Sequence, residues 1–293
     1  MASKMCLYED LNIAKKRDHQ NCGKALVSTI LEGKVAIVTG GARNVGESIA
    51  RIFAKHGAKV VIADALDELA QSVCQDISPE IASFFHCDVT NELDIKNAID
   101  TTIAKHGKLD VMINNAAIID GPKISILDVD KSEFETVISV NLTRVFLGTK
   151  HAARVMIPAR RGSIVSIGSV ACSVGGVSTH AFVSSKHAVV GLTKNVAAEL
   201  GQFGIRVNCL SPYVIVTEQM KKFNRMENEG GSGVYSNLKG VTLGMEDVAE
   251  AAVFLASDES KYVSGHNLAL DGGFTVINPA FGLFSRLINV FSI

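Results

Sequence analysis

Net charge, paired cysteines and long apolar runs are missing from this sequence, and each absence excludes a class of protein. Acidic and basic residues nearly cancel and leave a formal charge of −1, so no general attraction to nucleic acid or anionic lipid is expected. No run reaches the roughly 18 to 20 apolar residues that span a bilayer. The sequence therefore predicts a protein without nucleic-acid or membrane partners, whose ligands are small molecules.

The cysteines are scattered and form no CxxC pair or other metal-ligand spacing. We interpret them as reduced thiols and predict a cytoplasmic protein without a metal site. The acidic residues Glu9, Asp10 and Asp18 argue against a plastid-targeting peptide at the N-terminus. The cysteines are Cys6, Cys22, Cys74, Cys87, Cys172 and Cys209.

Of the 293 residues, 47% are apolar, which is sufficient for a substantial core. Three segments are expected along the chain. Residues 1–32 form a loosely ordered polar extension, and residues 33–275 form a single domain. The apolar tail, residues 276–293, either covers the substrate pocket, meets another subunit or packs on its own domain. Within the domain, the polar glycine-containing segment 216–240 is a candidate substrate loop.

Short runs rich in Val and Ile alternate with helical patterns throughout the domain. Continuous apolar strands need helices on both of their faces, so the pattern predicts an α/β fold with a doubly wound (Rossmann) seven-stranded parallel sheet. The seven runs are residues 34–40, 58–64, 83–88, 109–116, 162–169, 204–212 and 265–273.

The first 30 residues of this pattern, 35–64, read as a strand, a glycine turn, a helix and a second strand ending in an acid. Gly40 and Gly41 allow a tight turn, and Gly46 lets the helix begin near the sheet, with its N-terminal amides facing a pyrophosphate. The Asp64 carboxylate can accept hydrogen bonds from the hydroxyls of the adenosine ribose and would repel a 2′-phosphate, which favours NAD over NADP. Arg43 in the turn is the residue that could instead meet a phosphate.

Taken together, the motifs resemble those of the short-chain dehydrogenase/reductase family over about residues 33–275. The matching stretches are "TGGARNVG" (39–46), "CDVT" (87–90), "NNAA" (114–117) and "SPYVIVT" (211–217), with Asn141, Ser169 and Lys186 at single positions. Asn44 replaces a glycine of the first motif and tolerates a left-handed backbone. Ala117 replaces another glycine, which is a small-for-small change.

The resemblance implies further contacts with the cofactor. Asp88 and Val89 would flank the adenine, Asn115 would lie near the ribose, and Ile215 and Thr217 would hold the carboxamide end. The full set expected to bind NAD is Gly40, Gly41, Arg43, Asn44, Val45, Gly46, Asp64, Asp88, Val89, Asn115, Lys186, Ile215 and Thr217.

The resemblance also implies a catalytic tyrosine four residues before Lys186, where this sequence has Phe182. In the family the tyrosine exchanges a proton with substrate, the lysine binds the nicotinamide ribose, a serine (here Ser169) polarises the carbonyl, and an asparagine (here Asn141) supports a water relay. Phe182 keeps the aromatic ring but cannot transfer a proton. His180 is considered as a substitute base and is expected to lie before the helix in a loop.

The sequence most resembles the plant branch of the family, which includes secoisolariciresinol and xanthoxin dehydrogenases and the nepetalactol-related proteins of iridoid biosynthesis. The missing tyrosine favours a non-redox cyclase of a reactive terpenoid enol or dialdehyde, in which bound NAD completes the pocket wall. The alternatives are an NAD-dependent dehydrogenase with rerouted proton transfer and a non-catalytic NAD-binding subunit. The resemblance further implies a homotetramer or homodimer.

Overall fold

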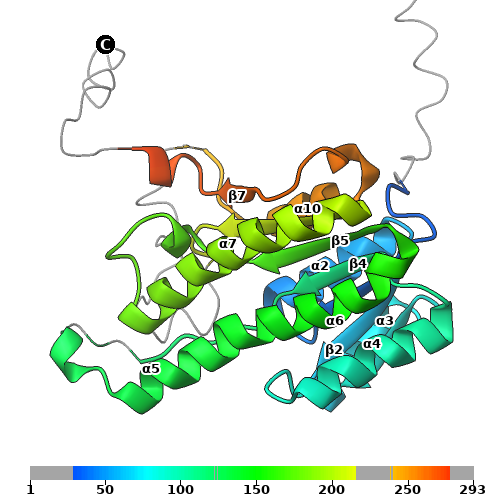
Figure 1. The fold of residues 1–293 in the computed structure, drawn as a ribbon, viewed down its shortest axis with the longest axis horizontal. Coiled ribbons are helices and arrows are strands. Elements are labelled where there is room, and N and C mark those ends of the chain that lie inside the picture. The colour runs from blue at the N-terminus through cyan, green and yellow to red at the C-terminus, as the bar shows by residue number, and fades with distance from the viewer. Residues whose placement is uncertain (1–28, 122, 124, 216–237, 239, 278–293) are drawn as a thin grey trace, which may run out of the picture.

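Seven parallel strands form the centre of the computed structural model, which describes residues 29–121, 123, 125–215, 238 and 240–277. Neighbouring strands follow the order β3-β2-β1-β4-β5-β6-β7, and every pair is parallel (Figure 1). The predicted doubly wound sheet is confirmed. Its strands are β1 Val35–Thr39, β2 Lys59–Asp64, β3 Ala82–His86, β4 Val111–Asn114, β5 Gly162–Ile167, β6 Ile205–Pro212 and β7 Asn267–Leu270.

Helices cover both faces of the sheet. One face carries α2, α3 and α10, and the other carries α4, α6 and α7. The α-helices are α2 Asn44–Lys55, α3 Asp67–Ile77, α4 Glu92–His106, α5 Lys131–Ile138, α6 Arg144–Ala159, α7 His180–Leu200 and α10 Met245–Ala256. Shorter helices are η2 Ile126–Asp128, η3 Ser139–Thr143, η4 Val170–Cys172, η5 Gly201–Phe203, η6 Asp258–Ser260 and η7 Phe274–Val276.

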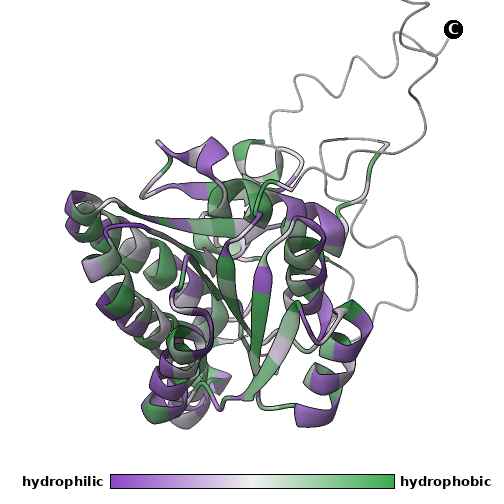
Figure 2. Ribbon diagram, turned by 90° about the vertical axis from the view of Figure 1, so that its right-hand side faces the viewer, coloured by the Kyte–Doolittle hydropathy of each residue, from purple (hydrophilic) through white to green (hydrophobic). Residues whose placement is uncertain are grey.

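The two faces explain why the strands are apolar without alternation. Val38 packs in the core on the α2 side with Phe53, and Ile37, the preceding residue of β1, packs in the core on the α4 side with Met156. Successive strand residues point to opposite faces, so both faces of β1 must be apolar. Figure 2 shows the apolar strands enclosed by helices whose polar surfaces face outward.

The described residues include only a few residues of the predicted N-terminal extension and of the C-terminal tail. Leu31 is fully buried in the core on the α2 side, and its amide donates to the His56 carbonyl at 2.9 Å. Residues 1–28 of the N-terminal extension, nearly all of the predicted substrate loop 216–240, and residues 278–293 of the tail lie outside the described residues. Cys74, Cys87, Cys172 and Cys209 are free, buried thiols.

Across the described ranges, no helix is long and apolar enough to cross a membrane. The same residues contain no group of three or more His, Cys, Asp or Glu side chains placed to hold a metal ion.

Candidate functional site

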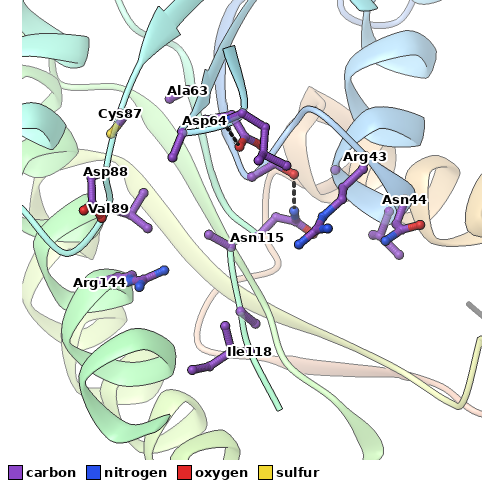
Figure 3. Close-up of a pocket in the computed structure, with 17 residues that line it drawn as sticks. Arg43, Asn44, Ala63, Asp64, Cys87, Asp88, Val89, Asn115, Ile118 and Arg144 are labelled. Carbon is purple, nitrogen blue, oxygen red and sulfur yellow. Dashed lines mark hydrogen bonds between the residues drawn. The ribbon is translucent and has the colours of Figure 1, made fainter. Parts of the chain in front are cut away.

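A cavity of about 430 Å³ opens at the carboxyl ends of β1, β2 and β4. The strand order reverses between β1 and β4, and crevices at such switch points are where open α/β sheets bind ligands. Nine residues that the sequence predicted as cofactor contacts line it together (Figure 3). They are Gly40, Arg43, Asn44, Val45, Gly46, Asp64, Asp88, Val89 and Asn115.

The glycine turn after β1 forms one wall of the cavity. Gly40 has φ of 64° and Asn44 has φ of 52°, so both occupy the left-handed region. A Cβ on Gly46 would lie 2.0 Å from the Gly40 carbonyl oxygen, which only glycine allows. The Asn115 amide ties the turn to β4 by donating to the Gly40 carbonyl at 3.0 Å. The turn thus brings the N-terminus of α2 to the cavity, as a pyrophosphate site requires.

Asp64 ends β2 at the next part of the wall and is only 8% exposed. Its Oδ2 accepts from the Ala42 amide at 2.9 Å, and its Oδ1 accepts from the Leu66 amide at 3.0 Å. These two bonds hold the carboxylate in one orientation, and each oxygen keeps a further lone pair for a ligand hydroxyl.

The far end of the cavity combines charged and apolar side chains. Asp88 accepts from the Thr90 amide at 2.8 Å and from its hydroxyl at 2.7 Å, and these bonds lower the pKa of Asp88. Arg144, the first residue of α6, also lines this end, and burial lowers the pKa of its guanidinium. Sequence reasoning missed Arg144, because an arginine beginning a helix resembles an ordinary surface charge.

Gly41, Ile215 and Lys186 are the predicted cofactor contacts among the described residues that do not line this cavity. A Cβ on Gly41 would meet Ile62 at 3.0 Å, so this glycine allows the turn to pack on β2 and does not line the cavity. Ile215 is partly buried against the core on the α2 side. Thr217 lies outside the described residues.

Lys186 and Phe182 share one face of α7, as their spacing predicts. The Lys186 Nζ donates to the Ile167 carbonyl at the end of β5 at 2.9 Å and lies 5.4 Å from the centroid of the Phe182 ring. The side chain of Lys186 is 3% exposed, and burial lowers its pKa to about 8, against smaller opposing effects of Cys209 and Cys172. The aromatic ring therefore stands beside the lysine without offering a hydroxyl.

Asn141 and Ser169 are held by backbone groups near this pair. Asn141 lies in the π-helical turn η3 and is fully buried; its side chain accepts from the Ile118 amide and donates to the Ile118 carbonyl, both at 2.9 Å. It also donates to the Ser185 hydroxyl at 3.2 Å, and that hydroxyl donates to the Phe182 carbonyl. Ser169 follows β5 and accepts from the Ala171 amide at 3.2 Å.

The expectation that His180 precedes the helix is wrong. His180 is the first residue of α7, because Thr179 serves as the N-cap and accepts from the Phe182 amide at 3.3 Å. His180 is exposed, and two helical positions place it on a different side of the helix from Phe182. It is therefore not positioned to replace the missing hydroxyl.

Comparison with known proteins identifies this architecture. A family model described as "Enoyl-(Acyl carrier protein) reductase" matches residues 40–275, and secoisolariciresinol dehydrogenase of Forsythia intermedia is 55% identical over 258 residues, covering 87% of this chain and 93% of the relative. The chain belongs to the short-chain dehydrogenase/reductase family. The predicted resemblance, including its plant branch, is confirmed.

Two further members of the family extend the comparison. The protein named "Borneol dehydrogenase, mitochondrial" of Lavandula x intermedia is 52% identical, with 89% of this chain and 99% of the relative covered. The crystal structure of gox2181 superposes with a TM-score of 0.79 at 29% identity, covering 85% of this chain and 99% of that one. The family is one of enzymes, and both plant relatives carry the names of dehydrogenases.

Proposed function

We propose that the protein is an NAD-binding enzyme that converts a terpenoid without tyrosine-mediated proton transfer, most concretely as a non-redox cyclase of a reactive enol or dialdehyde. The observation that carries this proposal is Phe182, which occupies the tyrosine position beside Lys186 and lacks the reacting hydroxyl. Among the described residues, the candidate substitute His180 is exposed on another side of α7.

NAD is favoured as the cofactor by the wall of the cavity. The close approach of Gly46 to Gly40 leaves backbone room for a pyrophosphate, and the fixed carboxylate of Asp64 would accept from ribose hydroxyls. A 2′-phosphate would bring negative charge against Asp64, a buried carboxylate whose oxygens are already oriented. Bound NAD would supply a nicotinamide next to the substrate, which would serve as a wall of the pocket in a cyclase and as a hydride acceptor in a dehydrogenase.

The residues near Phe182 retain the means to hold and polarise an oxygen. The Ser169 hydroxyl accepts from the Ala171 amide and keeps its own hydrogen for a carbonyl or enol oxygen. The Asn141 side chain holds the backbone of Ile118, and Ile118 lines the cofactor cavity. Asn141 would therefore position the part of the cavity wall that adjoins the substrate. Cyclisation of a reactive substrate depends mainly on orientation and electrostatic stabilisation, so these groups suffice for it.

A second candidate is an NAD-dependent dehydrogenase of a terpenoid alcohol or lactol with rerouted proton transfer. The names of the plant relatives favour it, since borneol is a terpenoid alcohol. A third candidate is a non-catalytic NAD-binding subunit. The proposal also includes a cytoplasmic location and assembly into a homotetramer or homodimer. Sedimentation of the purified protein would test the oligomeric state.

One incubation separates the three candidates. Purified protein is mixed with NAD and, in parallel, with a terpenoid alcohol and a terpenoid enol or dialdehyde, while nicotinamide absorbance is followed and products are separated by chromatography. Cyclised product without NADH supports the cyclase. Robust NADH formation from the alcohol would overturn it in favour of the dehydrogenase, and NAD binding with neither product would leave only the non-catalytic subunit.

A further inference from the structure

Arg144 reaches into the end of the cofactor cavity that lies farthest from the glycine turn. Its side chain projects between Asp88 and Val89 on one side and Ile118 on the other (Figure 3). The residue begins α6 directly after the π-helical turn that holds Asn141. A fixed stretch of backbone therefore aims the guanidinium into the cavity.

The guanidinium is incompletely satisfied within the described residues. Its Nε is buried and has no hydrogen-bond partner there. Asp88 attracts the guanidinium through space, while the Asp88 Oδ1 accepts from the Thr90 amide and hydroxyl. Burying a polar group without a partner costs free energy that a suitable occupant of the cavity would recover.

The chemistry of this end specifies what the occupant presents to Arg144. Arginine donates hydrogen bonds and accepts none, and its planar group stacks on aromatic faces. Val89 and Ile118 add apolar surface on either side, which suits a flat ring. Asp88 disfavours an anion here, whereas Arg43 and the amides of the glycine turn offer a phosphate site at the opposite end.

We propose that Arg144 recognises the adenine ring of the dinucleotide, through its planar face or an acceptor nitrogen, and so anchors the cofactor at the end away from the chemistry. This inference rests on the proposed NAD binding. It assigns to Arg144 a role in affinity that is separate from any role in the reaction.

Calorimetric titration with two fragments of the cofactor tests the inference. AMP carries the adenine, and nicotinamide mononucleotide lacks it. Arg144→Met keeps an unbranched apolar side chain and removes the guanidinium with its donors, so we expect it to weaken NAD and AMP binding by about 10- to 100-fold, with unchanged affinity for nicotinamide mononucleotide. Arg144→Lys, which keeps the charge and loses the planar fork, is expected to give a smaller loss.

Lys150→Met provides the matched control. Lys150 is an exposed residue of the same helix that pairs with Glu92 at 2.7 Å, and its loss should leave all three affinities unchanged. Because Arg144→Met removes a half-buried charge whose Nε has no hydrogen-bond partner among the described residues, the melting temperature without ligand should not fall, while the rise on adding NAD should be smaller than in the wild type.

The outcomes distinguish this inference from the proposed function. Wild-type NAD binding with undiminished AMP affinity in both Arg144 variants would overturn the role of Arg144 alone. An equal loss of AMP and nicotinamide mononucleotide affinity would also overturn it, because the effect would then not be specific to adenine. Failure of the wild-type protein to bind NAD would overturn the inference and the proposed cofactor together.

Discussion

Restoring the missing hydroxyl by Phe182→Tyr should create or greatly increase dehydrogenase activity. The Phe182 ring already lies with its centroid 5.4 Å from the Lys186 Nζ, and the helix start depends on Thr179 and the backbone rather than on this ring. The substitution therefore adds one oxygen to a position that the fold already holds. A positioned general acid or base contributes about 100- to 10,000-fold in rate, or about 3 to 5 kcal/mol of barrier.

The assay is NADH formation from a terpenoid alcohol at saturating NAD, with products identified by chromatography. Phe146→Tyr is a matched control, because Phe146 is an exposed aromatic residue of α6 and its new hydroxyl would lie at the surface. Adding Lys186→Met to Phe182→Tyr should remove most of the gain, since a neighbouring positive charge would favour the ionised form of the new tyrosine. A folded Phe182→Tyr protein that binds NAD and substrate but oxidises the alcohol no faster than the wild type would refute the reasoning.

Three further predictions concern the cofactor site and its lysine. Asp64→Asn should shift the ratio of NADP to NAD affinity at least about tenfold toward NADP, measured by titration, because it removes the negative charge that faces the 2′ position; an unchanged ratio would contradict this role. Gly46→Ala should abolish NAD binding, since its methyl group would lie 2.0 Å from the Gly40 oxygen and 2.5 Å from the Asn115 amide nitrogen; wild-type affinity would refute the close-packed turn. Burial lowers the Lys186 pKa from 10.5 to about 8. Between these two pH values the unfolded state binds more protons than the folded state, so the free energy of unfolding should rise between about pH 8 and pH 10, by at most about 3 kcal/mol. Denaturant titrations should show this rise in the wild type and not in Lys186→Met.

Local chemistry explains why the fold and the glycine turn could be predicted from the sequence. The run of β1 is apolar from Val35 to Val38 because both of its faces are buried, and Gly40 and Gly46 stand where the backbone turns or touches itself. Asp64 could be predicted because it directly ends β2. Each of these residues acts through the backbone next to it, so its position relative to the neighbouring strand is enough to predict its role.

Features that depend on contacts between distant segments could not be predicted. Arg144 enters the cavity because a π-helical turn precedes it and because Val89 and Ile118 lie opposite, and none of this is visible in its neighbours along the chain. The start of α7 at His180, in contrast, has a local signal in the sequence. Thr179 is a favoured N-cap residue, and it places the start of α7 at His180.

Hydride transfer by the wild-type protein is the most direct test of the central claim, that the cofactor pocket is retained while tyrosine-mediated redox chemistry is lost. A terpenoid alcohol carrying deuterium on its carbinol carbon is incubated with the protein and NAD, and the nicotinamide is analysed by mass spectrometry. We predict that NAD binds and stays unlabelled, while Phe182→Tyr transfers the label. Rapid transfer of deuterium to NAD by the wild-type protein would contradict the account.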